Sequence, residues 1–249
     1  MPRFLMRISY DGTCFQGWQK QPEGRTVQGE VERALGVLMQ KEISLYGSGR
    51  TDTGVHAEAQ YAHFDTPEPV DHAFICDRLR KLLPREIWVH GVFPVRDDFH
   101  ARFDALWRQY RYQLLLTPDP MLRLYGWFPG YELDHEQLRK CVAITLGEHD
   151  FSGFSKKNED LPHHRCTILA AAIERDDSSA VLQIRFRANR FLRSMIRGLV
   201  GAAVTVARRR ESTGWFRECL DERKQMEQIT LAPARGLILE KVFYPDSAF

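Results

Sequence analysis

An aspartate and an arginine lie two residues apart in a glycine-rich segment, Gly47-Ser48-Gly49-Arg50-Thr51-Asp52-Thr53-Gly54-Val55-His56-Ala57. Glycines 47, 49 and 54 permit backbone angles that are closed to other residues and let the main chain come close to a ligand. We therefore predict a loop that holds the carboxylate of Asp52 in place for chemistry. Arg50 is a candidate partner that would keep this carboxylate ionised at neutral pH. An isolated Asp-x-Gly is more typical of an exposed turn, so the rest of the chain must decide between the two interpretations.

Arginines are concentrated in one stretch of a chain that is almost neutral overall. The net charge is only +2, yet residues 185–210 contain eight arginines and no acidic residue. Such a basic face suits a phosphate-rich ligand better than a membrane. Arg190, Arg193 and Arg197 fall within a predicted helix over residues 190–208, where a row of arginines is equally typical of a solvated face. The arginine-lined strand that precedes them, at residues 180–187, favours a phosphate-binding surface.

A second mixture of arginines and aromatic residues comprises Arg102, Arg108, Tyr110, Arg111 and Tyr112. Alternation along a predicted strand at residues 107–116 places Arg108, Tyr110 and Tyr112 on one face. A tyrosine in a sheet usually belongs to the core. Aromatic rings interleaved with arginines are also what base stacking and phosphate contacts require.

Three other patterns point to chemistry that we reject. Asp52-Thr53-Gly54 matches the aspartic-protease triplet, but that site needs two carboxylates that share a proton, and Arg50 would oppose protonation. His149, His163, His164 and Cys166 match no standard metal-site spacing, so we expect no metal. The sequence contains no phosphate-binding loop or dinucleotide fingerprint, and we expect no cofactor.

Composition places the chain among ordinary globular proteins. Its 249 residues, 43% hydrophobic and 27% charged, suffice for one large domain or two packed halves. Five scattered cysteines argue against a disulfide framework and indicate a reducing compartment. No apolar run reaches membrane-spanning length and the N-terminus lacks a signal-like apolar region, so we expect a cytoplasmic protein that does not bind membranes.

The order of the predicted elements indicates an α+β fold. We expect strands near residues 4–10, 43–46, 61–64, 86–95, 107–116, 166–174, 180–187 and 237–244. Helices are expected after Thr26, after Asp71 and after Asp134, in addition to the one over residues 190–208. Strands and helices do not alternate strictly, so we predict a mixed, mainly antiparallel sheet with helices on one face. Two related split βαβ halves, residues 1–105 and 106–249, would surround a basic cleft.

At this point several motifs together resemble one known family. The segment Gly49-Arg50-Thr51-Asp52-Thr53-Gly54-Val55-His56-Ala57 is similar to the catalytic signature of the TruA-type tRNA pseudouridine synthases. Further segments agree with that family in the same order along the whole chain. They are Phe15-Gln16-Gly17-Trp18-Gln19, Thr26-Val27-Gln28, Asp98-Phe99-His100-Ala101-Arg102, Arg108-Gln109-Tyr110-Arg111-Tyr112, Gly147-Glu148-His149-Asp150-Phe151, Phe191-Leu192-Arg193-Ser194-Met195-Ile196-Arg197 and Ala232-Pro233-Ala234-Arg235-Gly236-Leu237.

The resemblance implies an isomerase that converts uridine to pseudouridine in the anticodon arm of tRNA, at positions 38 to 40, without metal or cofactor. It implies that Asp52 is the essential catalytic aspartate and that Tyr110 lies against the target base. Arg50 and Arg197 would surround the aspartate. Arg193, Arg190 and Arg102 are expected to bind the tRNA substrate. The family works as a homodimer, so a homodimer is expected here.

The chain departs from the family pattern at four positions. Thr53 replaces the usual alanine, Arg193-Ser194 replaces a pair similar to His-His, and Gly198 replaces the usual asparagine. These departures bear on which uridines are modified, while the catalytic segment is intact. The alternative function is a tRNA-binding or chaperone-like protein whose pseudouridylation is secondary or at altered positions.

Overall fold

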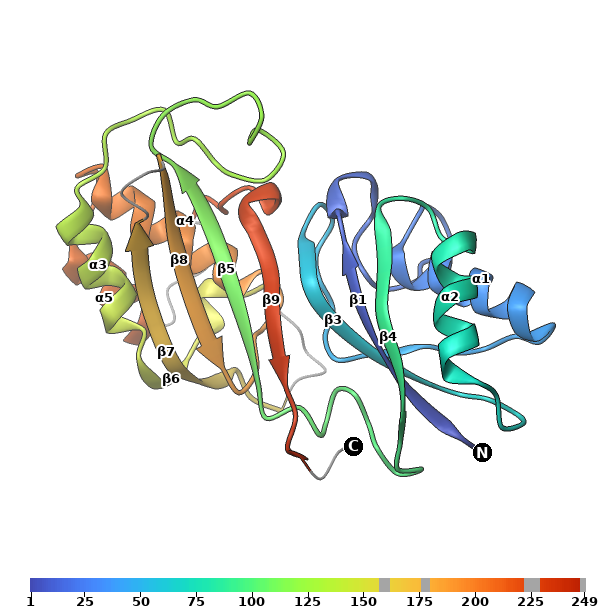
Figure 1. Cartoon of the computed structure of the whole chain (residues 1–249). Coiled ribbons are helices and arrows are strands. Elements are labelled where there is room, and N and C mark those ends of the chain that lie inside the picture. The colour runs from blue at the N-terminus through green and yellow to red at the C-terminus, as the bar shows by residue number, and fades with distance from the viewer. Residues whose placement is uncertain (157–161, 176–179, 222–228, 247–249) are drawn as a thin grey trace. The chain divides into compact units, whose positions relative to one another are not determined.

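The computed structural model describes residues 1–156, 162–175, 180–221 and 229–246 (Figure 1). Two compact units make up the chain. The first comprises residues 1–107 together with the C-terminal residues from Ile238 onward, and the second comprises residues 108–237. The C-terminal strand, which the sequence places in the second half, therefore packs within the first unit.

The sheet of the first unit is centred on β1 (Arg3–Tyr10). Two strands flank it, β3 (His56–Asp65) and β4 (Ile87–Val95), and both are antiparallel to it. The helix α2 (His72–Leu82) connects β3 to β4. Because β1 lies between two strands that are parallel to each other, this unit contains a split βαβ arrangement, as predicted.

Two further strands extend this sheet at β3. The short β2 (Tyr46–Gly47) pairs antiparallel with His63 and Ala62 of β3. At the other end of β3, His56 and Ala57 pair in parallel with β9 (Leu237–Phe243).

The two helices of the first unit begin where the sequence places caps. α1 (Val27–Met39) follows Thr26, whose hydroxyl oxygen accepts a hydrogen bond from the Gly29 amide at 3.2 Å. The Asp71 carboxylate does the same for the Ala73 amide at the start of α2, at 2.9 Å. Such caps satisfy amides that have no partner inside the helix. The two helices contact each other (Figure 1).

The second unit has an antiparallel sheet in the order β5 (Trp107–Leu115), β8 (Val181–Ala188), β7 (Arg165–Arg175) and β6 (Gly147–Asp150). Along β8, Leu182, Ile184 and Phe186 are buried, whereas Arg185 and Arg187 on the opposite face are partly exposed. This alternation was predicted, and it separates an apolar face from an arginine-bearing face.

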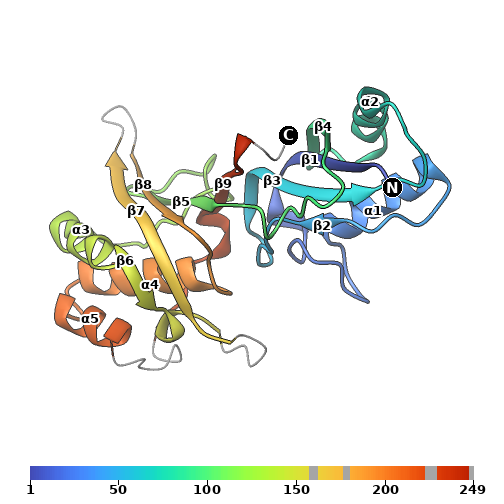
Figure 2. The same cartoon turned by 90° about the horizontal axis from the view of Figure 1, so that it is seen from below.

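Three helices, α3 (His135–Ile144), α4 (Met195–Ala207) and α5 (Thr213–Asp221), pack together on one face of this sheet (Figure 2). Three 3-10 turns, η1 (Gly12–Cys14), η2 (Ser152–Phe154) and η4 (Ala234–Gly236), complete the described helical segments of the chain. The mainly antiparallel α+β fold with helices on one face is confirmed. β6 and α5 were not predicted.

The predicted helix over residues 190–208 begins five residues later than expected. Ser194, directly before α4, has a φ of 62°, which is incompatible with a continuous right-handed helix. Once formed, α4 is approached closely by neighbouring backbone. A Cβ on Gly201 would lie 1.9 Å from the carbonyl oxygen of Thr230, and one on Gly198 would lie 2.6 Å from that of Phe154. Both glycines are therefore required by packing.

None of the helices in the described part of the chain is long and apolar enough to span a membrane.

Candidate active site

The predicted aspartate loop (residues 48–55) connects β2 to β3 in the first unit. Its first half is tied to β3 by three hydrogen bonds. The Ser48 amide donates to the carbonyl of Tyr61 at 2.7 Å. The Ser48 hydroxyl donates to Oε1 of Gln60 at 2.6 Å, and Nε2 of Gln60 donates to the carbonyl of Gly49 at 2.9 Å. Gln60 is fully buried, so its bond with the Ser48 hydroxyl is shielded from competing water.

The second half of the aspartate loop is held by residues 15–18. The Trp18 amide donates to the carbonyl of Thr51 at 3.1 Å, and the Gly54 amide donates to the carbonyl of Phe15 at 3.3 Å. Within the loop, the Val55 amide donates to the carbonyl of Asp52 at 3.1 Å and closes a tight turn. Asp52 thus lies at the start of a turn that is anchored on both sides, as the glycine pattern predicts.

The expectation that glycines 47, 49 and 54 provide special backbone angles is only partly met. Gly54 has a φ of +77°, the conformation predicted for it. Gly47 is required instead because a Cβ would lie 2.5 Å from Nε1 of Trp18. At Gly49 the φ is not positive, so the expected special backbone angle is absent. A Cβ there would meet nothing within 4 Å, and the close approach to a ligand stays a prediction.

A close backbone approach that the sequence did not reveal occurs at Gly17. Its φ is +87°, and a Cβ there would lie 2.6 Å from the carbonyl oxygen of Thr51 and 3.1 Å from the carbonyl carbon of Asp52. The backbone of the aspartate loop therefore packs directly on Gly17. The segment Phe15-Gln16-Gly17-Trp18 lies in one of the motifs that carry the family resemblance, but its own residues carry no signal for this packing role.

The loop presents the two predicted polar groups at the surface. The side chain of Asp52 is partly exposed and that of Arg50 is exposed. The predicted ion pair between the two residues stays a prediction.

Arg102 is the remaining predicted site residue of the first unit. It is exposed, and its guanidinium lies 5.6 Å from the ring of Phe103. The chain before it is fixed because Nδ1 of His63 accepts the Ala101 amide at 3.1 Å and the Tyr244 hydroxyl donates to the Ala101 carbonyl at 2.7 Å. Burial lowers the pKa of His63 to about 4, which keeps Nδ1 free to accept at neutral pH.

Tyr110 and Arg197 belong to the second unit. Tyr110 lies on β5 opposite Phe186, with only 8% of its surface exposed, and its ring meets Phe191 edge-on at 5.2 Å. Arg197 lies on α4, where its Nε donates to the carbonyl of Ala232 at 2.8 Å. The Ala232 amide in turn donates to the Arg197 carbonyl at 3.0 Å. Both side chains are thus held in defined positions.

The neighbouring Tyr112 is a core residue. It is fully buried, and its hydroxyl donates to the carbonyl of Pro233 at 2.8 Å. Burial raises the pKa of this phenol, so it remains a donor at neutral pH. Tyr112 and Arg197 therefore fix the adjacent residues Pro233 and Ala232, inside one of the motifs that carry the family resemblance.

The predicted arginine row on one helix is wrong. Arg190 and Arg193 precede α4, and only Arg197 lies on it. Arg193 is exposed in the turn before Ser194, while Nη2 of Arg190 donates to the carbonyl of His163 at 2.9 Å. On β8, Arg187 donates to the side chain of Gln109 at 3.0 Å. All these arginines belong to the second unit, but they do not form a single helical stripe.

The histidines and cysteine considered as metal ligands make ordinary contacts. His149 is bonded to the carbonyl of Leu146 at 2.8 Å, and Nδ1 of His163 accepts the Arg165 amide at 3.2 Å. Cys166 is buried on β7, opposite His149. Among the residues that the structure describes, no group of three or more potential ligands is placed to hold a metal ion.

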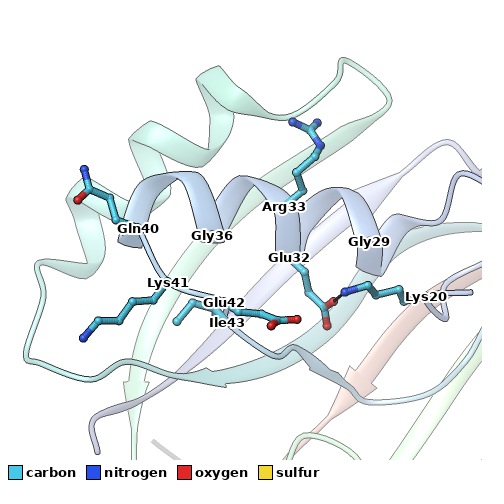
Figure 3. Close-up of a pocket in the computed structure, with 9 residues that line it drawn as sticks. All are labelled: Lys20, Gly29, Glu32, Arg33, Gly36, Gln40, Lys41, Glu42 and Ile43. Carbon is cyan, nitrogen blue, oxygen red and sulfur yellow. Dashed lines mark ion pairs between the residues drawn. The ribbon is translucent and has the colours of Figure 1, made fainter. Parts of the chain in front are cut away.

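A hollow of about 490 Å³ lies beside α1 and is lined by residues between Lys20 and Ile43 (Figure 3). Its charges are mixed: Lys20 is paired with Glu32 at 3.0 Å, and Arg33 is paired with Glu30 at 2.6 Å. None of the predicted site residues lines it. It offers no chemistry for the candidate reaction.

Comparison with known proteins identifies the class. Residues 6–104 and 142–245 match the family described as tRNA pseudouridine synthase. A tRNA pseudouridine synthase A of Parabacteroides distasonis is 38% identical over 251 residues, which cover 100% of this chain and 98% of that protein. Another, of Pelodictyon phaeoclathratiforme, is 41% identical over 248 residues, with 98% and 100% covered. The chain belongs to the tRNA pseudouridine synthase family.

Solved structures add little to this assignment. A chain in the crystal structure of the archaeal box H/ACA sRNP Nop10-Cbf5 complex aligns with 81% of this chain at 12% identity. Its TM-score of 0.34 is too low to bear on the fold. The predicted enzyme class, a uridine isomerase that acts on tRNA, is therefore confirmed at the level of the family by sequence.

Proposed function

We propose that this protein converts uridine to pseudouridine at positions 38 to 40 in the anticodon arm of tRNA, with Asp52 as the essential catalytic residue. The observation that carries the proposal is the aspartate loop, where hydrogen bonds on both sides fix the backbone around a partly exposed aspartate. Family membership supplies the reaction class, and this loop is the segment that resembles the family's catalytic signature.

The reaction needs no oxidant or reductant. The N1–C1′ glycosidic bond breaks, the uracil turns, and C5 forms a bond to C1′. C5 then loses its proton, and N1 takes one up. The target must first leave the base stack, at a cost of a few kcal/mol. Asp52 acts either as a nucleophile at C1′ or as a base that removes a sugar proton.

The other predicted residues have supporting roles in this proposal. Tyr110, held edge-on by Phe191, offers a rigid ring for contact with the uracil. Arg50 and Arg197 stabilise negative charge around the reacting groups, because guanidinium ions remain charged at all relevant pH values. Arg102, Arg190 and Arg193 bind phosphates of the tRNA.

The direct test of the position is a carbodiimide primer-extension assay on tRNA from a strain that lacks the gene. Stops at positions 38 to 40 should disappear on deletion and return when the gene is restored. Stops that persist in the deletion strain, with no second enzyme shown to produce them, would contradict the assignment.

Arg193→Ala should weaken tRNA binding and reduce its dependence on salt. Each phosphate contact that is lost removes about one released counterion, so the slope of log K against log[salt] should fall by about 1. The measurement is filter binding of tRNA at several salt concentrations. Arg139→Ala is the control, because Arg139 is an exposed arginine of the same unit, on α3. A slope unchanged in the Arg193 variant would place this arginine outside the interface.

We further propose that the protein works in the cytoplasm as a homodimer without a metal or cofactor, as the family resemblance implies. Light scattering of the purified protein should give about twice the chain mass of 29.0 kDa. A mass equal to one chain, under conditions where the enzyme is active, would exclude the dimer. Fractionation of cells tests the location, and activity that survives dialysis against a chelator tests the absence of a metal.

A further inference from the structure

Directly before Asp52, a buried pair of hydroxyl groups joins the aspartate loop to the core. The Tyr10 hydroxyl lies 2.7 Å from Oγ1 of Thr51. Tyr10 is 4% exposed and Thr51 is 7% exposed, so this hydrogen bond is shielded from water. We propose that the Tyr10–Thr51 hydroxyl pair positions the Asp52 carboxylate for reaction. This inference rests on the proposed catalytic role of Asp52.

Thr51 is fixed at two separate atoms. Its side chain is bonded to Tyr10, and its carbonyl accepts the Trp18 amide at 3.1 Å. Tyr10 is itself fixed, since it ends β1 and its ring lies 6.1 Å from that of Trp18. Only one peptide plane separates Thr51 from Asp52. The orientation of that plane determines where the Asp52 side chain begins.

Gly17 also confines this peptide plane. A Cβ on Gly17 would lie 2.6 Å from the Thr51 carbonyl oxygen, which belongs to the plane, and 3.1 Å from the carbonyl carbon of Asp52. The close backbone at Gly17 and the buried hydroxyl pair together leave the plane little freedom. A fixed carboxylate matters because displacements of about 1 Å at a reacting group can reduce rates by about a hundredfold.

The aspartate loop also contains a second buried hydrogen bond, which can be compared with the Tyr10–Thr51 pair. Ser48 and Gln60 form this bond, at 2.6 Å, but four residues away from Asp52. This bond fixes the entry to the loop rather than the catalytic residue. The Tyr10–Thr51 pair, by contrast, is a buried side-chain link at the residue directly before Asp52. A positioning role predicts that its loss affects turnover more than binding or folding.

The test is a double-mutant cycle with Tyr10→Phe, Thr51→Val and both together. We expect each single variant to lower kcat by about 10- to 100-fold, while KM and the Kd for tRNA stay within about twofold. The double variant should be no worse than the poorer single variant, because both disrupt one interaction. Thr51→Ser, which keeps the hydroxyl group, should restore most of the kcat lost in Thr51→Val.

Thr66→Val is the matched control for a purely structural effect. Thr66 is also a buried residue of the first unit, and its hydroxyl donates to the Glu68 carbonyl at 2.8 Å. This variant should lower the unfolding midpoint by an amount similar to Thr51→Val and leave kcat unchanged. If kcat in the Tyr10 and Thr51 variants falls only in proportion to the folded fraction, or if the effects multiply, the positioning role is excluded.

Two results separate this inference from the proposed function. An Asp52→Asn variant that still turns over would remove the catalytic role of Asp52, and with it the basis of the inference. An inactive Asp52→Asn variant together with a Tyr10→Phe variant of wild-type kcat would overturn the positioning role alone. If Tyr10→Phe does not fold, the comparison of Thr51→Val with Thr51→Ser decides, because equal kcat in these two would exclude a role for the hydroxyl group.

Discussion

An Asp52→Asn variant should lose turnover by roughly 10⁴-fold or more while its affinity for tRNA stays within about twofold. Asparagine preserves the shape of the side chain but is neither a nucleophile nor a base. The loop should keep its fold, because the hydrogen bonds described above involve the backbone of Asp52 and the side chains of Ser48, Gln60 and Thr51. Binding depends mainly on arginines elsewhere in the chain and should change little.

Release of tritium from tRNA labelled at C5 of uridine measures this loss, because the reaction frees the C5 proton. Filter binding of the same tRNA gives the affinity. Asp77→Asn is the control, since Asp77 is an exposed carboxylate of the first unit that pairs with Lys81 on α2. Appreciable tritium release by the Asp52 variant would exclude Asp52 from the mechanism. Loss of both binding and turnover would instead favour a role in holding the substrate.

Gly17→Ala should reduce both the stability of the protein and its kcat. The added Cβ would lie 2.6 Å from the Thr51 carbonyl oxygen, and the φ of +87° is unfavourable for alanine. Strained backbone of this kind costs about 1–3 kcal/mol, and relief of the overlap requires the Thr51–Asp52 peptide to move. We expect kcat to fall by roughly a hundredfold or more, beyond what the folded fraction explains.

Thermal unfolding and single-turnover kinetics, measured on the same preparation, separate the two effects. Gly36→Ala on α1 is the control, because a Cβ there would meet only the Lys41 carbonyl at an ordinary 3.5 Å. Alanine in a helix should be neutral or stabilising by up to about 1 kcal/mol. A normal kcat in folded Gly17→Ala would show that the Thr51–Asp52 peptide can move without loss of activity. The close approach at Gly17 would then not contribute to catalysis.

The sequence was sufficient for those parts of the fold that local rules determine. Thr26, Asp71 and Asp134 were predicted to start helices, and each accepts a hydrogen bond from an amide of the first turn. α5 could also have been predicted, since Phe216, Cys219 and Leu220 have helical spacing. β6 (Gly147–Asp150) could not, because its four residues show no apolar alternation.

The sequence predicts the aspartate loop of the candidate site but not the residues that pack against it. The glycine-rich loop around Asp52 is a local signal, and its residues were found directly. The partners that hold it, Tyr10 and Gly17, are distant in sequence, and nothing in the residues around them indicates contact with this loop. The start of α4 was predicted wrongly for another reason. The pattern of residues 190–194 is compatible with a helix, but Ser194 adopts a left-handed conformation. That choice depends on tertiary contacts such as the bond from the Lys156 amide to the Arg193 carbonyl.

The pairing of β9 with β3 has a consequence for how the protein is made. The first unit is split in the sequence: it consists of residues 1–107 and of the C-terminal segment that contains most of β9. The ribosome must therefore synthesise the roughly 130 residues of the second unit, 108–237, before β9 can pair with β3. At about 5–20 residues per second, this takes roughly 7–26 s on the ribosome. During that interval His56 and Ala57 of β3 have no β9 to pair with, and an open strand edge invites aggregation. Nascent chains that stall within the second unit should therefore be preferred clients of chaperones and substrates of proteases.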